Sequence, residues 1–141
     1  MKPVTSVICI SVLIVGFLLC AGCASYTTPE INIVPTITQV NASPDTLTLT
    51  YDVILDITNT GSNNAYDVAV MVLVSTPTDL PEYRFIHENI EVGTIEKKQS
   101  TSVKTQLALQ MTPDNYSLLS RGERKAEVEA KITSMSSNIM G

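Results

Sequence analysis

The sequence predicts an all-β protein, an antiparallel β-sandwich of about seven strands preceded by an N-terminal apolar helix that serves as a signal or anchor. Three observations predict this fold. Apolar and polar residues alternate with a period of two along several stretches of the chain, polar turn residues separate these stretches, and neither a long amphipathic helix nor an internal repeat is present.

Three stretches alternate most clearly and are expected to be half-buried strands. In residues 46–58 the core side is Leu47, Leu49, Tyr51, Val53, Leu55 and Ile57, with Ile54 as the exception on the other side. Residues 102–111 and 126–133 repeat the pattern. Residues 31–40 alternate more weakly, and Pro35 indicates an edge strand there because proline cannot donate to the ladder.

Residues 65–75 are apolar on both alternating faces and are expected to form a buried strand. Val68, Val70, Val72 and Val74, together with Tyr66, share one face. The opposite face carries Ala69, Met71 and Leu73. These three side chains are either covered by the proline loop at residues 76–81 or form an interaction patch for a partner or a second copy.

The remaining segments predict shorter elements. Residues 83–95 are expected to form one or two short strands with a turn near Gly93. Residues 112–125 are expected to be a connection with a single helical turn, capped by Asp114 or Asn115.

The first 22 residues have the layout of a signal peptide. Lys2 supplies a short charged region, residues 7–19 form an apolar core, and small residues follow. Polar residues 24–30 are expected to be a tether. The predicted organisation is a leader at 1–22, an attachment and tether segment at 23–30, a β-sandwich domain at 31–135 and a tail at 136–141.

The end of the leader, "LLCAGC", resembles the lipobox of bacterial and archaeal lipoproteins, with Leu19, Ala21 and Gly22 before Cys23. The resemblance implies that Cys23 becomes the mature N-terminus and carries lipid, which would hold the domain on a membrane. A plain signal peptide and an uncleaved anchor stay open as alternatives. All three place the domain outside the cytoplasm, and the lipoprotein interpretation anchors it to the cell membrane.

Charge and cysteine content exclude several functions. The chain has a net charge of −5, and without Lys2 the remainder carries 8 basic and 14 acidic residues, or 8 − 14 = −6. No basic stripe is present, so nucleic acid is not an expected partner. Cys9, Cys20 and Cys23 all lie in or next to the leader, so the domain can have neither a disulfide nor a cysteine-based metal site. No cofactor is expected.

The stretch from about Leu47 to Leu109, which runs from the first long strand through the valine strand to the threonine-rich strand, resembles immunoglobulin-like surface modules of the cell-adhesion-related (CARDB) type. The matching positions are Asn59, Gly61, Ala65, Val68, Gly93 and Val103. This resemblance implies an immunoglobulin-like sandwich without a catalytic centre. The strand order is also similar to that of the water-stress and hypersensitive-response (WHy) domain, another β-sandwich.

The segment "DITNTGSNNAYDV" at residues 56–68 has the composition of a cation-binding loop. As an EF-hand it places threonines where acidic residues are needed and lacks the final glutamate, so that reading is rejected. An irregular calcium site would use Asp56, Asn59, Asn63 and Asp67. The preferred interpretation is a turn in which asparagines bond to the backbone and Gly61 supplies a positive φ, with both aspartates in solvent.

No catalytic constellation is expected. His87 is the single histidine, no serine lies in a Gly-x-Ser-x-Gly elbow, and His87 is expected to be exposed on a strand. Glu127 and Glu129 alternate near Lys125 and Lys131, which is typical of a solvated outer face.

Asn41 and Asn115 begin the two glycosylation sequons, and both are expected in turns. The sequence thus predicts a membrane-anchored extracytoplasmic lipoprotein with a non-catalytic module for cell-surface binding or structure. Its partner would be an envelope protein or a surface glycan. The alternative is an accessory or chaperone-like assembly subunit of an envelope complex that uses the face formed by Ala69, Met71 and Leu73; a secreted enzyme is disfavoured.

Overall fold

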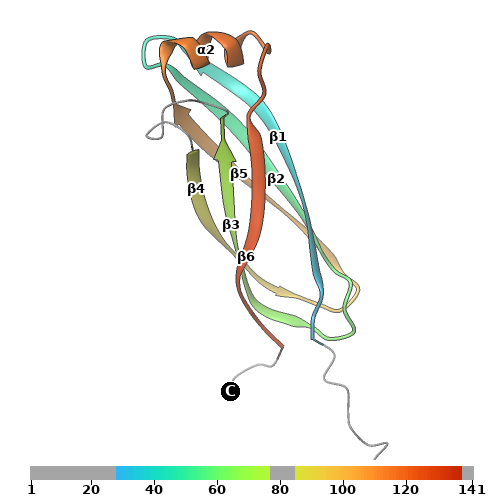
Figure 1. Cartoon of the computed structure of the whole chain (residues 1–141). Coiled ribbons are helices and arrows are strands. Elements are labelled where there is room, and N and C mark those ends of the chain that lie inside the picture. The colour runs from blue at the N-terminus through green and yellow to red at the C-terminus, as the bar shows by residue number, and fades with distance from the viewer. Residues whose placement is uncertain (1–27, 77–84, 138–141) are drawn as a thin grey trace, which may run out of the picture.

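The computed structural model describes residues 28–76 and 85–137, and this part of the chain contains six β-strands and one short helix (Figure 1). In chain order these elements are β1 (Ile31–Ser43), β2 (Thr48–Asn59), β3 (Ala65–Ser75), β4 (Phe85–Ile95), β5 (Ser100–Gln110), α2 (Pro113–Ser120) and β6 (Glu127–Ser136). The predicted N-terminal helix falls on residues 1–27, outside the described residues.

The strands form two three-stranded antiparallel sheets, with the orders β1-β2-β5 and β4-β3-β6. The prediction of an all-β antiparallel sandwich is confirmed. The described ranges hold six strands rather than about seven, because residues 85–95 form one continuous strand. The proline-containing strand β1 lies at the edge of its sheet, as predicted.

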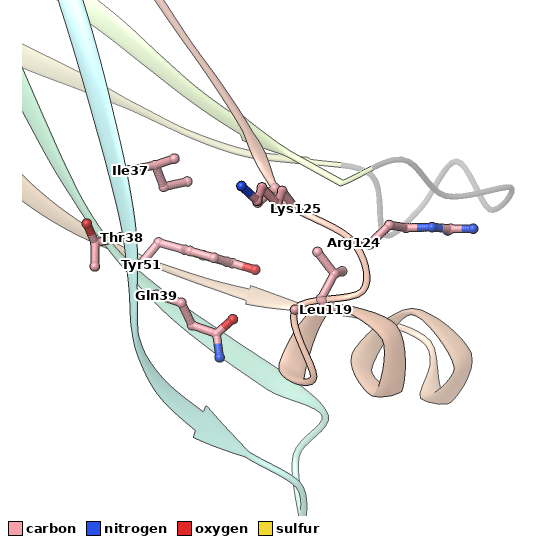
Figure 2. A pocket seen from close by; sticks show the side chains of 9 residues that line it. Ile37, Thr38, Gln39, Tyr51, Leu119, Arg124 and Lys125 are labelled. Atoms are coloured by element: carbon pink, nitrogen blue, oxygen red, sulfur yellow. The ribbon is translucent and has the colours of Figure 1, made fainter.

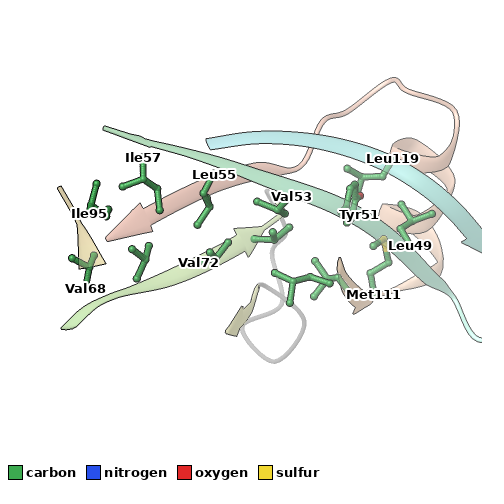
Figure 3. Close-up of a cluster of buried hydrophobic side chains, with 14 of the residues drawn as sticks. Leu49, Tyr51, Val53, Leu55, Ile57, Val68, Val72, Ile95, Met111 and Leu119 are labelled. Carbon is green, nitrogen blue, oxygen red and sulfur yellow. The ribbon is translucent and has the colours of Figure 1, made fainter. Parts of the chain in front are cut away.

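The core lies between the inner faces of the two central strands, β2 and β3 (Figure 3). Its fully buried aliphatic side chains are Leu49, Val53, Leu55, Ile57, Val68, Val70, Val72 and Val74. Full burial of each such side chain is worth about 1.5–3 kcal/mol relative to exposure. The period-two pattern of β2, β5 and β6 therefore assigned the core face correctly, because each of these strands has one face on the core and the other in solvent.

A β-bulge at Asp67 changes the facing of residues at the start of β3. Between the pairs that Ala65 and Val68 make with β4, β3 has one residue more than its partner. Asp67 adopts a left-handed φ of 52°, a conformation that bulges use. As a result Ala65 and Val68 are both buried despite their opposite parity. The prediction that Tyr66 faces the core is wrong: Tyr66 is half-buried, and its hydroxyl oxygen accepts a hydrogen bond from Asn64.

Gly93 lies inside β4 and not in a turn, so that prediction is also wrong. It pairs with Val68 at the irregular part of the β3–β4 ladder and has a φ of 86°. Glycine adopts this conformation without the steric cost that a side chain would meet. The strand can therefore pass through the irregularity without ending.

The two ends of the sandwich differ in what closes them. Figure 1 shows α2 at one end, next to the start of β2, whereas the start of β1 and the end of β6 lie at the other end. In sequence terms, the chain enters the domain at Ile31, which pairs with Asn59 at the far end of β2. β1 and β6 lie along the same side of the sandwich, one in each sheet.

Candidate functional site

A pocket of about 350 Å³ opens at the α2 end, between β1, the first half of β2 and the connection from α2 to β6 (Figure 2). β1 contributes Ile37 and Gln39, β2 contributes Tyr51, and α2 contributes Leu119. The α2–β6 connection contributes its glycine, two cationic residues and Ala126. This volume lies at the lower end of the range typical of small-molecule sites, which are largely apolar with a few polar groups.

Tyr51 supplies the polar group at the base of this pocket. The alternation of β2 places Tyr51 on the core face between Leu49 and Val53, and only 4% of its surface is exposed. Its hydroxyl has no hydrogen-bond partner among the described residues. Figure 2 shows this hydroxyl directed toward Leu119 and the α2–β6 connection. Burial raises the pKa of Tyr51 to about 12, so the phenol is neutral at physiological pH and can donate a proton to an acceptor.

The helix α2 forms the outer wall of the pocket. Pro113 occupies its first turn, where a missing N–H costs nothing, and Thr112 stands at the N-cap position. Leu119 is buried against the core and fixes the helix in place. The helix ends at Ser120, and Gly122 follows it with a φ of 74° and an N–H that donates to the Leu119 carbonyl oxygen, which reverses the chain. The predicted helical turn is therefore an eight-residue helix, with Asn115 inside it rather than at its cap.

Asn115 ties the far end of the connection to this helix. Its Nδ2 donates to Thr112 Oγ1 at 3.2 Å, and its Oδ1 accepts from Arg124 Nη1 at 3.0 Å. Only 7% of Asn115 is exposed. These bonds hold the backbone next to Arg124 in one position, so the rim of the pocket is set by the fold.

The charge of the pocket is opposite to that of the protein. Of the residues that line it within the described ranges, Arg124 and Lys125 are cationic and none is acidic, although the chain carries a net charge of −5. Figure 2 shows Arg124 extending away from the opening, where its guanidinium donates to Asn115, while Lys125 extends over the opening toward Ile37. Lys125 is thus the cation that a bound molecule would meet.

The opposite end of β2 carries a second buried polar residue, Asn59, whose side chain is fully hydrogen bonded. Its Nδ2 donates to the carbonyl oxygens of Asn63 at 2.8 Å and Ile95 at 3.1 Å. Its Oδ1 accepts from the Gly61 N–H at 3.0 Å. The Asn59 backbone also bonds in both directions to the β4–β5 turn, through Gln99 and Lys98.

These contacts answer the question of the cation loop. Asn59 faces the interior and uses its amide within the protein, whereas Asp56 and Asp67 are exposed, as predicted. In the described part of the chain, no three His, Cys, Asp or Glu residues are grouped so as to hold a metal ion. The segment is a structural connection, with Asn59 as its internal cross-link.

Gly61 is required by close packing and not by a positive φ, which corrects the expectation from the sequence. A Cβ at this position would lie 2.6 Å from the backbone nitrogen of Glu30 and 3.0 Å from the Cα of Pro29. The Thr60 N–H also donates to the Glu30 carbonyl oxygen at 2.7 Å. The chain that leads into β1 is therefore held against this connection.

The face formed by Ala69, Met71 and Leu73 lies on the outer side of the central strand β3, where all three side chains are half-buried. Met71 pairs with an exposed asparagine of β4 and an exposed lysine of β6. Phe85, at the start of β4, is 56% exposed, and its ring centroid lies 6.3 Å from that of His87. His87 is exposed, as predicted.

The remaining predicted site residues have different outcomes. Asn41 is exposed but lies within β1, and Asn115 lies in α2, so neither is in a turn. The buried, doubly hydrogen-bonded amide of Asn115 does not suit a glycosylation acceptor in the folded domain. Cys23 lies outside the described residues. Within the described ranges, no helix has both the length and the apolar character needed to cross a membrane.

The sequence interpretation missed the pocket. It placed Tyr51 correctly in the core but treated Lys125 as an ordinary surface charge. One signal was present: a tyrosine among aliphatic core positions brings a hydroxyl that needs a partner. Its position beside Leu119 depends on how α2 folds back, and the alternation pattern carries no such information.

No protein-family model matches the chain, and no curated protein matches it either. Among solved structures, the chain is similar to a Bordetella pertussis protein provisionally named ApaA, with 14% identity over 59% of this chain and 68% of that one, and a TM-score of 0.41. It is also similar to the structural-genomics target SoR45, with 10% identity over 75% of this chain and 83% of that one, and a TM-score of 0.46. At these values the likenesses carry no functional argument.

Proposed function

We propose that the protein is an extracytoplasmic lipoprotein, anchored to the cell membrane through lipid on Cys23, whose non-catalytic β-sandwich binds a ligand at the cell surface. The leader supports the location, because an apolar run at residues 7–19 ends in Ala21, Gly22 and Cys23. The pocket beside Tyr51 supports the binding role. It is the observation that carries the proposal, because it joins an open pocket with a partly apolar lining to a buried hydroxyl that has no partner among the described residues.

The position of the pocket fits this arrangement. The chain enters the domain at Ile31, at the end opposite α2 (Figure 1). A strand rises about 3.3 Å per residue, so the 13 residues of β1 span roughly 40 Å. An anchor before residue 31 would therefore present the pocket on the side of the domain away from the membrane.

The domain itself is proposed to be an immunoglobulin-like module of the CARDB type. The proposal is supported by the sheet orders β1-β2-β5 and β4-β3-β6, which match the orders A-B-E and C′-C-F of immunoglobulin-like sandwiches; the described residues contain no counterpart of the last strand of the second sheet. The WHy-type sandwich is the second family proposal. Both are binding or structural modules, which agrees with His87 lying exposed on β4 and not in the lining of the pocket.

The second candidate function is that of an accessory or assembly subunit of an envelope complex. It is favoured by the outer face of β3, where Ala69, Met71 and Leu73 lie near the exposed ring of Phe85. Crosslinking in membranes tests it. A stoichiometric envelope partner, lost when Met71→Lys and Leu73→Thr are combined in a folded variant, would favour this role over a ligand-binding one.

Intact-mass analysis of the protein extracted from membranes tests the anchor. The proposal expects a mature chain that begins at Cys23 and carries the mass of attached lipid, whereas Cys23→Ser is expected to abolish both the lipid and the membrane association. A mature chain that begins at Met1 or at Ala24 would overturn the lipoprotein assignment.

A further inference from the structure

We propose that the pocket beside Tyr51 binds a small organic carboxylate with a compact apolar body, whose carboxylate is held by the Tyr51 hydroxyl and the Lys125 ammonium group. The inference rests on the proposed binding function and adds the class of ligand. It does not depend on the lipid anchor, because every group that carries it lies in the described domain.

The apolar part of the ligand follows from the walls. Ile37, Leu119 and Ala126 line the pocket from three different elements. Leu119 and the Tyr51 ring belong to the buried core, so this wall is rigid. A space of about 350 Å³ lies at the lower end of the range for small-molecule sites, so the apolar body of the ligand is expected to be small.

The hydroxyl of Tyr51 requires an acceptor or donor inside this space. A buried polar group without a partner is destabilising, and native structures seldom tolerate one without water or a ligand nearby. Within the described ranges nothing bonds to this hydroxyl. Because the phenol stays protonated far above neutral pH, it serves best as a donor to an anionic oxygen.

The negative charge expected of the ligand follows from the charged residues at the rim of the pocket. The lining residues include two cations and no acid in the described part of a chain whose net charge is −5. Arg124 donates to Asn115, so its guanidinium is committed to the fold, and Lys125 is the cation that extends over the opening. The Tyr51 hydroxyl and the Lys125 ammonium group can each donate to one oxygen of a carboxylate, and Thr38 and Gln39 add neutral polar groups to the lining. A phosphate is usually held by more donors, often several arginines.

Binding can be measured on the full chain in phosphatidylcholine nanodiscs. The tyrosines are replaced by 3-fluorotyrosine, and the ¹⁹F signal of Tyr51 is assigned by its loss in Tyr51→Phe. The probes are hexanoate, its neutral analogue hexanamide and its cationic analogue hexylammonium, with inorganic phosphate at equal ionic strength as a fourth. Empty nanodiscs give the blank for partitioning into lipid.

We expect hexanoate to shift the Tyr51 signal in a saturable way, and hexanamide and hexylammonium to bind at least about fivefold more weakly, as the loss or reversal of one partly exposed charge contact implies. Phosphate is expected to give no saturable shift. A saturable shift with phosphate equal to that with hexanoate would identify a general anion site and overturn the carboxylate assignment.

Matched variants locate the recognition. Lys125→Gln is expected to weaken hexanoate about fivefold and to remove its advantage over hexanamide, whereas Lys131→Gln, an exposed lysine of the same strand region outside the pocket, leaves binding unchanged. Lys125→Glu is expected to reverse the preference toward hexylammonium. Saturation-transfer NMR of hexanoate reports on Tyr51→Phe, which is expected to bind about fivefold more weakly because one hydrogen bond is lost.

Each outcome decides the proposal. It fails if no probe gives a saturable shift at Tyr51, if hexanamide matches hexanoate, or if Lys125→Gln binds hexanoate as the parent chain does while retaining its circular dichroism spectrum. Failure of the anchor is a separate result. A mature chain that begins at Met1 but binds hexanoate would remove the lipoprotein assignment and leave the pocket assignment standing.

Discussion

Asn59 and Tyr51 lie on the same face of β2, near its opposite ends, and both place a polar group in the interior. The Asn59 amide makes three hydrogen bonds, to Asn63, Ile95 and Gly61. The Tyr51 hydroxyl makes none with the described residues and faces a pocket. Near one end of β2 the buried polar side chain therefore has all its hydrogen bonds, whereas near the other end the buried hydroxyl has no partner among the described residues.

The difference separates a structural polar group from a candidate binding group. A buried amide with every bond made rigidifies its surroundings and cross-links two loops that are distant in sequence. A buried hydroxyl without a partner lowers the stability of the folded protein. Binding of a ligand that offers an acceptor is therefore favoured, because it supplies the missing hydrogen bond. The segment at residues 56–68 has the composition of a cation loop, but its buried polar residue, Asn59, has a structural role. The plain alternating strand contains the candidate site.

The largest effect is expected from Asn59→Ala, which removes the hydrogen-bonded amide at the end of β2 opposite the pocket. The substitution leaves two carbonyl oxygens and one N–H without their partner in the interior, and should lower the free energy of unfolding by about 3 kcal/mol, near 1 kcal/mol for each lost bond. Urea denaturation measures the change. Asn89→Ala, at an exposed position of β4, is the control and should change stability by less than about 0.5 kcal/mol. Equal effects of the two variants would show that the network does not stabilise this end.

Gly61→Ala is expected to have the next largest effect. The added Cβ would lie 2.6 Å from the Glu30 backbone nitrogen, so the chain leading into β1 must shift. We expect a loss of about 1–3 kcal/mol, the range for forced overpacking. Gly122→Ala at the open end provides the contrast, because there the space is free and only the φ of 74° is unfavourable. If urea denaturation shows that Gly122→Ala loses much more stability than Gly61→Ala, the packing argument is contradicted.

At the pocket end of β2, removal of the Tyr51 hydroxyl is expected to change the free energy of unfolding in the opposite direction. Tyr51→Phe removes a buried hydroxyl that has no partner in the described part of the protein and should raise the free energy of unfolding by up to about 1 kcal/mol. Tyr66→Phe removes a hydroxyl that accepts a bond from Asn64 and should lower it slightly. Thermal and urea denaturation of both variants provide the test. Destabilisation by Tyr51→Phe would mean that its hydroxyl already has a structural partner, such as bound water.

The smallest effect is expected at Asp52, next to Tyr51 in sequence but on the outer face of β2. The hydrogen bond from Lys104, and then that from Gln106, lowers the pKa of this carboxyl. Because the folded pKa is below the unfolded one, its stabilisation is present above the unfolded pKa and is lost as the pH falls through the folded pKa. Asp52→Asn should therefore make the free energy of unfolding fall less as the pH is lowered. Ligand binding in the pocket beside Tyr51 should be nearly unchanged. An unchanged acid limb in pH-dependent denaturation would refute this assignment.

The alternation of β2, β5 and β6 was sufficient to predict their faces, because each strand meets the core on one side and solvent on the other. The prediction failed where the backbone departs from regular pairing. The left-handed residue Asp67 reverses the parity of β3, so Ala65 takes the place expected for Tyr66. Gly93 has the same left-handed freedom inside a strand, where the sequence suggested a turn.

The candidate site was less predictable than the fold. Composition directed attention to Asp56, Asn59, Asn63 and Asp67, because oxygen-rich segments have the chemistry of cation sites. Whether such groups converge depends on which side of each sheet they face, and here Asn59 points inward while the aspartates are exposed. The pocket joins β1, β2 and the α2–β6 connection, which are separated by up to about 90 positions in the chain.

The sequence alone determined the antiparallel sandwich, the core faces of its regular strands and the apolar character of residues 7–19, because these follow from local periodicity and composition. Tertiary structure decided how the two polar groups of β2 are partnered. Asn59 meets the carbonyl oxygens of Asn63, in the β2–β3 connection, and of Ile95, at the end of β4. The Tyr51 hydroxyl lies at the base of a pocket beside Leu119 of α2 and has no hydrogen-bond partner among the described residues. The physical reason is that a hydrogen bond requires a partner at about 3 Å, and only the packing of distant segments brings one there.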